Sequence, residues 1–220
     1  MKSYFGLRLP ETLDEYLDPH RLALVVYDMQ VGICSQVSGA VTVVRAVQSV
    51  LETARSAGVR VVFTRHMSLP KELMGAMAYR TAMTWQRKKD PDEITPWFLR
   101  DSPGFALTPE LQPRQSEVIF DKTTFSAFEG TPLGATLRDC GVTTVAFAGI
   151  ALEVGIDPSV RHAADLGFVP VIISDACGFG NPEAGARALE AIRYAGDTII
   201  ADVRSVLAAL GQTQKSAVRS

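Results

Sequence analysis

The chain has 220 residues, of which 47% are hydrophobic and 21% are charged, a composition typical of a soluble globular protein. The formal net charge of −2 argues against nucleic acid or an anionic membrane surface as a partner. No apolar run is long enough to cross a bilayer, and the first residues lack the apolar core of a signal peptide. The three cysteines lack paired spacing, so we expect no disulfide framework and a cytoplasmic protein.

Apolar runs that are typical of strands alternate with helical patterns along most of the chain. Six runs predict strands, at residues 22–27, 59–64, 117–120, 143–148, 168–174 and 198–200. Four stretches between them predict helices, at residues 40–57, 131–139, 156–166 and 183–194, with Thr131 as the N-cap of the second. Strands this apolar are usually buried on both faces, so the pattern predicts an α/β fold with a mostly parallel six-stranded sheet and helices on both faces.

Three segments fall outside this alternation, and we expect all of them to belong to one domain over residues 1–220. Residues 1–20 form an N-terminal arm before the first strand, and residues 211–220 form a polar, frayed tail. Residues 67–114 are rich in proline and hold both tryptophans. An insertion of this length is a lid, an oligomer contact or a solvated excursion over the edge of the sheet.

Candidate chemistry gathers at the predicted strand ends. Asp28 follows the first strand, Lys122 follows the third, and a turn over residues 149–155 links the fourth strand to its helix. Because ligands bind at the carboxyl ends of parallel strands, an acid, a base and a helix N-terminus are expected to share one crevice.

The residues at these strand ends resemble three motifs of the isochorismatase-like (cysteine hydrolase) superfamily. The matching stretches are Asp28-Met29-Gln30, residues 122–128 with Thr131 and Leu133, and residues 149–156 with Arg161, Ala163 and Gly167. In addition, Asp175-Ala176 is similar to the superfamily's segment after the fifth strand. The resemblance runs from about residue 22 to residue 206. It implies a three-layer Rossmann-like fold, a small-molecule substrate and a homo-oligomer, either a dimer or a tetramer.

In superfamily members with a nucleophilic cysteine, the thiol attacks an amide or related carbonyl, an aspartate acts as general base and a lysine holds the charges in place. The resemblance assigns the last two roles to Asp28 and Lys122. It also implies a cis peptide near Ile150 and Ala151. The backbone N–H groups of Ala151 and Gly155 become the expected oxyanion donors.

Gly155 stands where most members carry the nucleophilic cysteine, and glycine has no side chain to attack with. We therefore expect a hydrolase of an amide, imide, ester or enol-ether bond, in which Asp28 and Lys122 assist water attack or protonation without a covalent intermediate. Two alternatives stay open: a non-catalytic ligand-binding or regulatory protein, and a cysteine hydrolase that uses a displaced Cys34. A cysteine introduced at position 155 is expected to restore a thiol where most members carry one, and to react quickly with electrophiles if the crevice is otherwise intact.

Glu153 lies in the same turn, as an additional acid–base group, a partner for Arg161 or Lys122, or a first-turn acid favoured by the helix dipole. Five further residues are expected to contact substrate: Gln30, Arg65, His66, Phe125 and Ile150. We expect no cofactor and no metal, because His66 has no second ligand near it in the sequence. Trp85 and Trp97 are candidates for a lid or a dimer contact.

Overall fold

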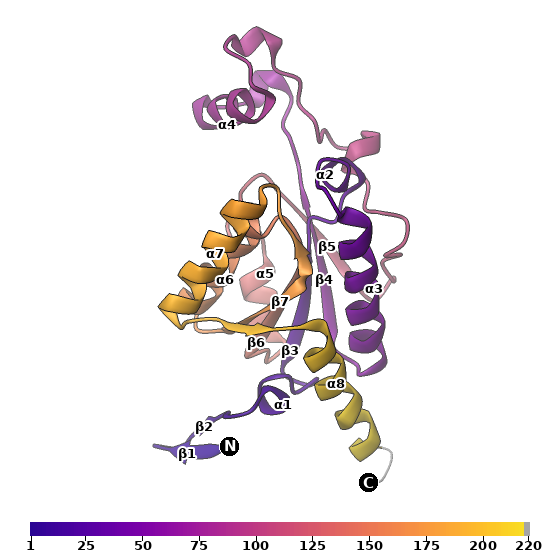
Figure 1. Cartoon of the computed structure of the whole chain (residues 1–220), viewed down its shortest axis with the longest axis vertical. Helices are drawn as coiled ribbons and strands as arrows, with labels where there is room; N and C mark the ends of the chain where they lie inside the picture. The colour runs from indigo at the N-terminus through magenta and orange to yellow at the C-terminus, as the bar shows by residue number, and fades with distance from the viewer. Residues whose placement is uncertain (218–220) are drawn as a thin grey trace.

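The structure, a computed structural model, describes the backbone of residues 1–217 and the side chains of residues 1–7 and 9–211. Its centre is a six-stranded sheet in the order β5-β4-β3-β6-β7-β8, in which every neighbouring pair is parallel (Figure 1). The strands are β3 (Leu22–Tyr27), β4 (Arg60–His66), β5 (Val118–Lys122), β6 (Thr144–Ile150), β7 (Val169–Gly178) and β8 (Ile199–Ala201). The predicted six-stranded parallel sheet is therefore confirmed.

Helices cover both faces of this sheet, which confirms the predicted three-layer arrangement. In Figure 1, one set lies to the right of the sheet and the other to the left. The first set is α3 (Ala40–Ser56) and α8 (Val203–Ala217), with the short α1 (Leu13–Tyr16) beside α8. The second set is α5 (Leu133–Asp139), α6 (Asp157–Asp165) and α7 (Pro182–Ala195).

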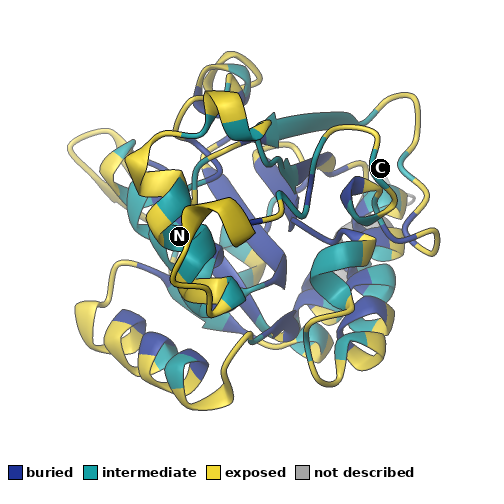
Figure 2. Cartoon of the chain, turned by 90° about the horizontal axis from the view of Figure 1, so that it is seen from above, coloured by how far each residue is buried: buried dark blue, intermediate teal, exposed yellow. Residues whose placement is uncertain are grey.

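All six residues of strand β3 are buried, and they pack against the helix layers on both faces of the sheet. Its side chains alternate between the two faces of the sheet. Leu22, Leu24 and Val26 pack with α3, whereas Ala23, Val25 and Tyr27 pack with α5 and α6. Figure 2 shows buried strands at the centre and helices whose outer faces are exposed. The register directs the ring of Tyr27 toward the side of the sheet that carries α6.

The structure adds elements that the sequence pattern did not predict. These are an antiparallel hairpin of β1 (Lys2–Tyr4) and β2 (Leu7–Leu9), the helices α1, α2 (Val31–Cys34) and α4 (Ala76–Gln86), and α8. Helix α8 continues to Ala217, beyond the residue at which the tail was expected to begin; residues 218–220 of that tail lie outside the described residues. It is anchored by Val206, Ala209 and Leu210, which are buried in the core.

Helix α5 begins two residues later than predicted, at Leu133, with Pro132 as its N-cap. Thr131 still satisfies the helix start, because its hydroxyl oxygen accepts the N–H of Leu133 at 3.3 Å. The same hydroxyl donates to the carbonyl of Ala127 at 2.6 Å. Thr131 thus ties the loop after β5 to the first turn of the helix.

The segment 67–114 divides into a projecting part and an anchored part. Helix α4 buries none of its residues and stands away from the sheet (Figure 1). The 3-10 turn η1 (Lys71–Leu73) precedes α4, and the 3-10 turns η2 (Pro91–Glu93) and η3 (Pro103–Phe105) follow it. Residues 87–114 lead back from α4 to the sheet. Ile94, Phe98, Phe105 and Leu111 in this stretch are buried, so it packs on the body of the protein. This places α4 beyond the carboxyl ends of the strands.

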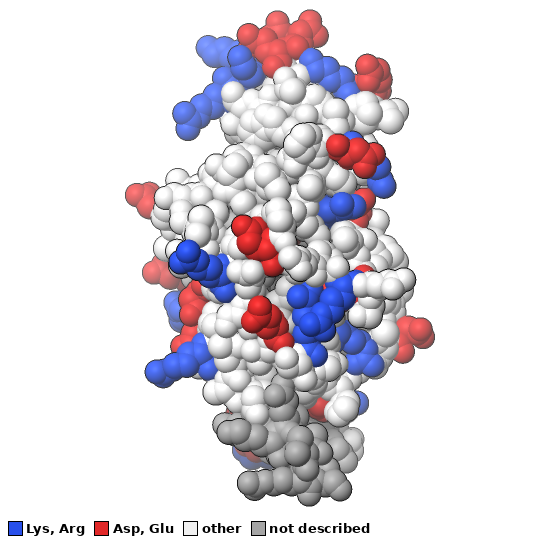
Figure 3. Space-filling model, turned by 90° about the vertical axis from the view of Figure 1, so that its right-hand side faces the viewer, with Lys and Arg blue, Asp and Glu red and all other residues white. Residues whose placement is uncertain are grey.

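No helix among the described residues is both long and apolar enough to cross a bilayer. Acidic and basic side chains are interspersed on the face shown in Figure 3, including the tip formed by the projecting segment.

Candidate active site

Two charged side chains meet at the carboxyl edge of the sheet, beneath α4. Asp28 directly follows β3, and Lys122 is the last residue of β5. The ammonium nitrogen of Lys122 lies 2.6 Å from Oδ2 of Asp28. The side chains are 1% and 5% exposed, respectively, so this is a buried ion pair. Parallel strands bring the two residues together although 94 positions separate them in the sequence.

The carboxylate of Asp28 is held at both oxygens. Thr64, on the neighbouring strand β4, donates its hydroxyl to Oδ1 of Asp28 at 2.6 Å. The backbone N–H of Asp28 donates to the Thr64 carbonyl at 3.2 Å. Asp28 has a φ of 47°, in the left-handed region, where the chain leaves β3. Each carboxylate oxygen keeps a further lone pair with which it can accept a proton or bind water.

The ammonium group of Lys122 uses all three of its hydrogen-bond donors. Besides Asp28, it donates to the Tyr27 hydroxyl at 2.8 Å and to the Thr124 carbonyl at 3.1 Å. It also lies 4.3 Å from the centre of the Tyr27 ring. Burial lowers the pKa of Lys122, and the neighbouring Asp28 opposes that shift.

Tyr27 occupies the space that a side chain at position 155 would need. A Cβ atom built on Gly155 would stand 1.9 Å from the hydroxyl oxygen of Tyr27 and 2.3 Å from its Cζ. No residue other than glycine fits there while the phenol keeps its position. The structure therefore overturns the expectation that a cysteine at position 155 would simply restore the missing thiol.

Sequence reasoning did not single out Tyr27. The only signal was a phenol at the end of a strand that is otherwise aliphatic, directly before Asp28. The Tyr27 hydroxyl donates to the carbonyl of Phe125, in the loop after β5. Burial raises the pKa of Tyr27 well above its usual value, and the adjacent Asp28 raises it further, so the phenol keeps its proton at neutral pH.

The turn after β6 is a π-helical turn, η4 (Leu152–Ile156), which begins beyond a cis peptide between Ile150 and Ala151. Within this turn the N–H of Gly155 donates to the Ala151 carbonyl at 3.0 Å. The expected pair of oxyanion donors is therefore reduced to one candidate, because the π-turn already uses the N–H of Gly155. Ala151 lines the cavity described next, and its N–H stays a candidate donor.

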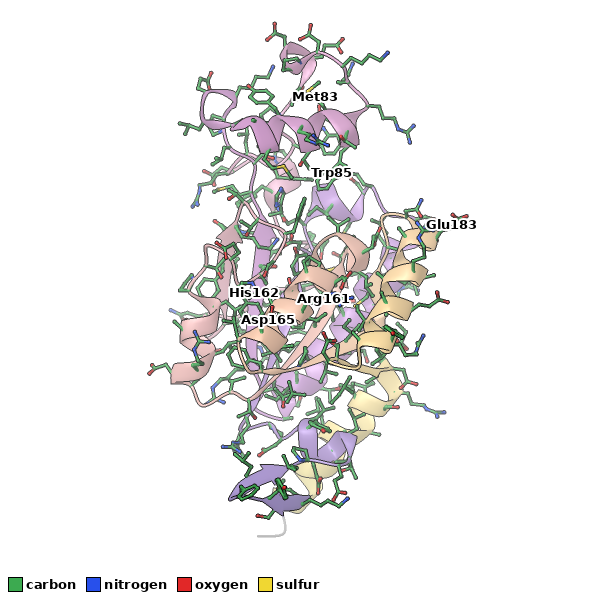
Figure 4. The ribbon with its side chains drawn as sticks, turned by 90° about the vertical axis from the view of Figure 1, so that its left-hand side faces the viewer. Met83, Trp85, Arg161, His162, Asp165 and Glu183 are labelled. Atoms are coloured by element: carbon green, nitrogen blue, oxygen red, sulfur yellow. The ribbon has the colours of Figure 1, made fainter. Side chains whose placement is uncertain are left out.

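A cavity of about 560 Å³ lies over the Asp28–Lys122 pair, and we call it the site cavity. Asp28, Tyr27, His66, Ile150 and Ala151 form its inner end. Its aromatic wall is built by Trp85, Trp97, Phe98 and Phe125. Trp85, on the side of α4 that faces the body of the protein (Figure 4), lies 5.9 Å from Phe125 between ring centres. The projecting helix thus contributes to the wall of this cavity.

Glu153 also lines the site cavity, and its two oxygens differ. Oε1 accepts the N–H of Asn181, at the start of α7, at 2.7 Å. Oε2 is buried and has no hydrogen-bond partner among the described residues. Neither of the partners suggested by the sequence is used, because Arg161 on α6 (Figure 4) pairs with Asp157 at 2.7 Å and Lys122 pairs with Asp28.

The five residues expected to contact substrate separate into two groups. His66, Phe125 and Ile150 line the site cavity. Gln30 is fully buried, and its amide group bonds the backbone of His66 and of Phe105. Arg65 pairs with Asp121 at 2.8 Å and stacks over Phe105 at 4.2 Å. Gln30 and Arg65 therefore hold the walls together, and neither is among the described residues that line the cavity.

His66 and Arg87 give the cavity two basic side chains. Burial lowers the pKa of His66 to about 4, with a further contribution from Lys122 that Asp28 opposes. The imidazole is therefore neutral at pH 7. Arg87, at the C-cap of α4, also lines the site cavity. Sequence reasoning treated Arg87 only as part of the insertion, and its sole signal was the charge run that it begins.

Cys34 lies on α2, close in sequence to residues that line the cavity. Ile33, Gln36 and Val37 reach the site cavity, whereas Cys34 packs against the core next to α3. Burial raises the pKa of the Cys34 thiol to about 11, which disfavours the reactive thiolate. Among the described residues, no group of three or more His, Cys, Asp or Glu side chains is placed to hold a metal ion.

Comparison with known proteins decides the family. Residues 22–203 match the Isochorismatase domain family, which covers most of the chain. The chain belongs to the isochorismatase family. Its fold, with the Asp28–Lys122 pair at the carboxyl edge of a parallel sheet, is thus that of an isochorismatase-family hydrolase.

Two relatives are similar to this chain in sequence. The chain is 28% identical over 210 residues to the ureidoacrylate amidohydrolase RutB of Methylobacterium radiotolerans, covering 89% of this chain and 81% of the relative. It is 27% identical over 185 residues to the protein of the same name from Pantoea ananatis, covering 77% and 74%.

Two solved structures share the fold of this chain. A cysteine hydrolase from Pseudomonas syringae pv. phaseolicola superposes with a TM-score of 0.77 at 23% identity, covering 90% of this chain and 95% of that one. Nicotinamidase PncA from Bacillus subtilis gives a TM-score of 0.70 at 20% identity, covering 83% and 99%.

Proposed function

We propose that this isochorismatase-family hydrolase cleaves the C–N bond of a small amide, imide or ureide by direct attack of water, without a covalent enzyme intermediate. The observation that carries the proposal is the buried Asp28–Lys122 pair beside a position 155 that has no side chain. The absence of a nucleophile at that position leaves water as the attacking group. Esters and enol ethers stay within the range of substrates that such a site could take.

In the proposed reaction, Asp28 accepts a proton from water while the water oxygen bonds to the substrate carbonyl carbon. Thr64 and Lys122 keep the Asp28 carboxylate oriented toward the cavity. The N–H of Ala151 stabilises the oxygen on which negative charge develops. A buried Lys–Asp pair costs desolvation energy and is a poor device for stability alone, which supports a catalytic use.

The walls of the site cavity favour a planar substrate that carries an acid group. Trp97 and Phe125 offer aromatic faces, and Arg87 offers a guanidinium that can pair with a carboxylate. The relatives named as ureidoacrylate amidohydrolases favour the same chemistry, since ureidoacrylate is a planar acid with a ureide C–N bond. We therefore place ureidoacrylate first among the substrates to be tested.

The test is a panel of amides, imides, ureides, esters and enol ethers, given to wild type and to Asp28→Asn. Turnover by wild type that falls at least 100-fold in Asp28→Asn supports the proposal, since general-base catalysis contributes roughly 10²- to 10⁴-fold. Equal turnover by both proteins rules out the role of Asp28. If wild type hydrolyses nothing, the second candidate, a ligand-binding protein, is favoured, and shifts in melting temperature with the same compounds test it.

The displaced-thiol alternative makes a separate prediction. If Cys34 were the nucleophile, iodoacetamide would abolish turnover and substrate would protect the enzyme. We expect turnover to survive alkylation, because Cys34 packs into the core and its thiol holds its proton.

Two wider expectations accompany the proposal. We propose a homo-oligomer, either a dimer or a tetramer, which α4 and its exposed Met77 would help to form, and sedimentation of the purified protein tests this. We also propose that the protein works in the cytoplasm, in keeping with three cysteines that are all free.

A further inference from the structure

The phenol of Tyr27 lies where the family thiol would project. The 1.9 Å between the Tyr27 oxygen and a Cβ on Gly155 means that oxygen and thiol cannot coexist in this geometry. Tyr27 also lines the site cavity, so a substrate in that cavity can meet it. The position of the lost nucleophile is therefore filled by a group that carries a proton.

A continuous hydrogen-bonded chain joins this phenol to the proposed base. Oδ2 of Asp28 accepts from Lys122 at 2.6 Å, and the same ammonium group donates to the Tyr27 oxygen at 2.8 Å. The three residues are buried, at 3% (Asp28), 3% (Lys122) and 2% (Tyr27) exposure. Bulk water therefore does not compete for this chain, and protons can pass along it.

We propose that Tyr27 is the catalytic acid of this site, delivering to the leaving nitrogen the proton that Asp28 takes from water. The proposal rests on the proposed function, since it needs water attack at a carbonyl in the site cavity. It assigns to the phenol the task of protonating the leaving nitrogen, which the protonated Asp28 would otherwise have to perform.

The protons balance over one turnover. Water attacks the carbonyl carbon, one of its protons goes to Asp28, and the carbonyl π electrons move to oxygen. When that oxygen re-forms the double bond, the C–N bond breaks and its electron pair takes the Tyr27 proton. Lys122 then gives a proton to the phenolate oxygen and takes the proton held by Asp28. The products are an acid and an amine, and the enzyme returns to its starting state.

The pKa shifts of Tyr27 and Lys122 agree with Tyr27 as a proton donor and not as a nucleophile. Burial raises the pKa of Tyr27 well above its usual value, so the phenolate that would attack a carbonyl is scarce. Burial also lowers the pKa of Lys122, which makes its ammonium group a readier proton donor to the phenolate. In the free protein the hydroxyl directs its proton at the carbonyl of Phe125, a residue that itself lines the site cavity.

The test compares two substrates with wild type and Tyr27→Phe: the panel amide that turns over fastest and the 4-nitrophenyl ester of the same acid. An amine cannot leave without a proton, whereas 4-nitrophenolate can. We expect kcat/KM for the amide to fall at least 100-fold and kcat/KM for the ester to change less than about fivefold, in line with the roughly 10²- to 10⁴-fold contribution of a positioned acid. Tyr194→Phe, at an almost fully exposed tyrosine, is the matched control and should leave both unchanged.

Other outcomes separate the failures. Equal losses on both substrates would make Tyr27 a positioning residue, and no loss on the amide would remove it from the mechanism; either overturns the proposal. Absence of wild-type turnover on the whole panel would instead count against the proposed function. If Tyr27→Phe does not fold, wild type alone is informative: the amide reaction should slow more in D₂O than the ester reaction, and equal slowing overturns proton delivery by Tyr27.

Discussion

The side chain of Tyr27 and any side chain at position 155 exclude one another, because the Tyr27 hydroxyl oxygen lies 1.9 Å from the site of a Cβ on Gly155. The absence of a side chain at position 155 and the position of the phenol therefore depend on one another. The ring fills what would otherwise be a void beside a buried ion pair, and it brings a hydroxyl into hydrogen-bond contact with Lys122.

Gly155→Cys alone should destabilise the protein by about 1–3 kcal/mol, because the new side chain overpacks a filled site. Combining it with Tyr27→Ala should remove the conflict, so that the double variant is more stable than the sum of the single changes by at least about 1 kcal/mol. Urea unfolding of the four proteins measures this coupling. Additive effects would mean that the ring moves aside freely, contrary to the packing described above.

Thiol reactivity gives a second readout of the same pair. In the double variant, the introduced thiol at position 155 should be alkylated by iodoacetamide faster than any native cysteine, because truncation of Tyr27 opens the space between position 155 and the site cavity, next to Lys122. Gly155→Ala combined with Tyr27→Ala is the control, since it adds no thiol. An inert thiol in the double variant would argue against the position assigned to the cavity.

His66 should make stability depend on pH. Its folded pKa of about 4 lies below the usual value of 6.5, so above pH 6.5 both the folded and the unfolded states hold a neutral imidazole. As pH falls from 6.5 toward 4, the unfolded state binds a proton that the folded state does not, and stability is lost. The loss should reach roughly 3 kcal/mol at pH 4.

The measurement is the free energy of unfolding in urea at pH 7 and at pH 4.5 for wild type and His66→Gln. The variant should lose less stability than wild type over this interval. His20→Gln, at an exposed histidine, is the control and should follow wild type. Identical losses in all three proteins would show that His66 titrates normally in the folded state.

Glu153→Gln tests the buried oxygen that has no partner. The substitution keeps an oxygen for the N–H of Asn181 and replaces Oε2 by an amide NH₂, so the fold should be unchanged. If Oε2 accepts a hydrogen bond from the substrate, kcat/KM should fall about 10- to 100-fold, the weight of a hydrogen bond to a charged group. Glu183→Gln, at the exposed start of α7 (Figure 4), is the matched control. Unchanged kinetics in Glu153→Gln would mean that Glu153 does not contact substrate and serves only to join η4 to α7 through its hydrogen bond with Asn181.

Arg87→Gln should reveal whether the substrate carries a carboxylate. The guanidinium lines the site cavity but belongs to the projecting segment, so its loss should not alter the melting temperature. KM for acidic substrates such as ureidoacrylate should rise roughly tenfold, while KM for a neutral amide of similar size stays constant. Lys88→Gln, at the next residue and outside the described lining of the cavity, serves as control. A KM that changes equally for acidic and neutral substrates would mean that Arg87 shapes the cavity wall but does not pair with a substrate carboxylate.

Local patterns in the sequence determined the six strands, the four helices between them and the two charged residues at strand ends. Such patterns suffice because apolar runs of this length can be satisfied only by burial on both faces of a parallel sheet, and parallel strands put their carboxyl ends at one edge. The sequence alone was therefore enough to place Asp28 and Lys122 at the same edge of the sheet. Helices α1, α2, α4 and α8 were not predicted. Of these, α8 is held by Val206, Ala209 and Leu210 in the core, and α4 buries none of its residues.

Only the tertiary structure decided what fills the space beside Gly155. Tyr27 and Gly155 lie on different strand–turn units, and nothing in either local sequence indicates that the Tyr27 ring enters the space beside Gly155. The tertiary structure also decided that the Gln30 amide is hydrogen-bonded to the backbone of His66 and Phe105. It likewise decided that the N–H of Gly155 donates to the Ala151 carbonyl within the π-turn, so that it is not available as an oxyanion donor. Such contacts depend on distances between distant segments of the chain, which hydrophobic periodicity does not encode.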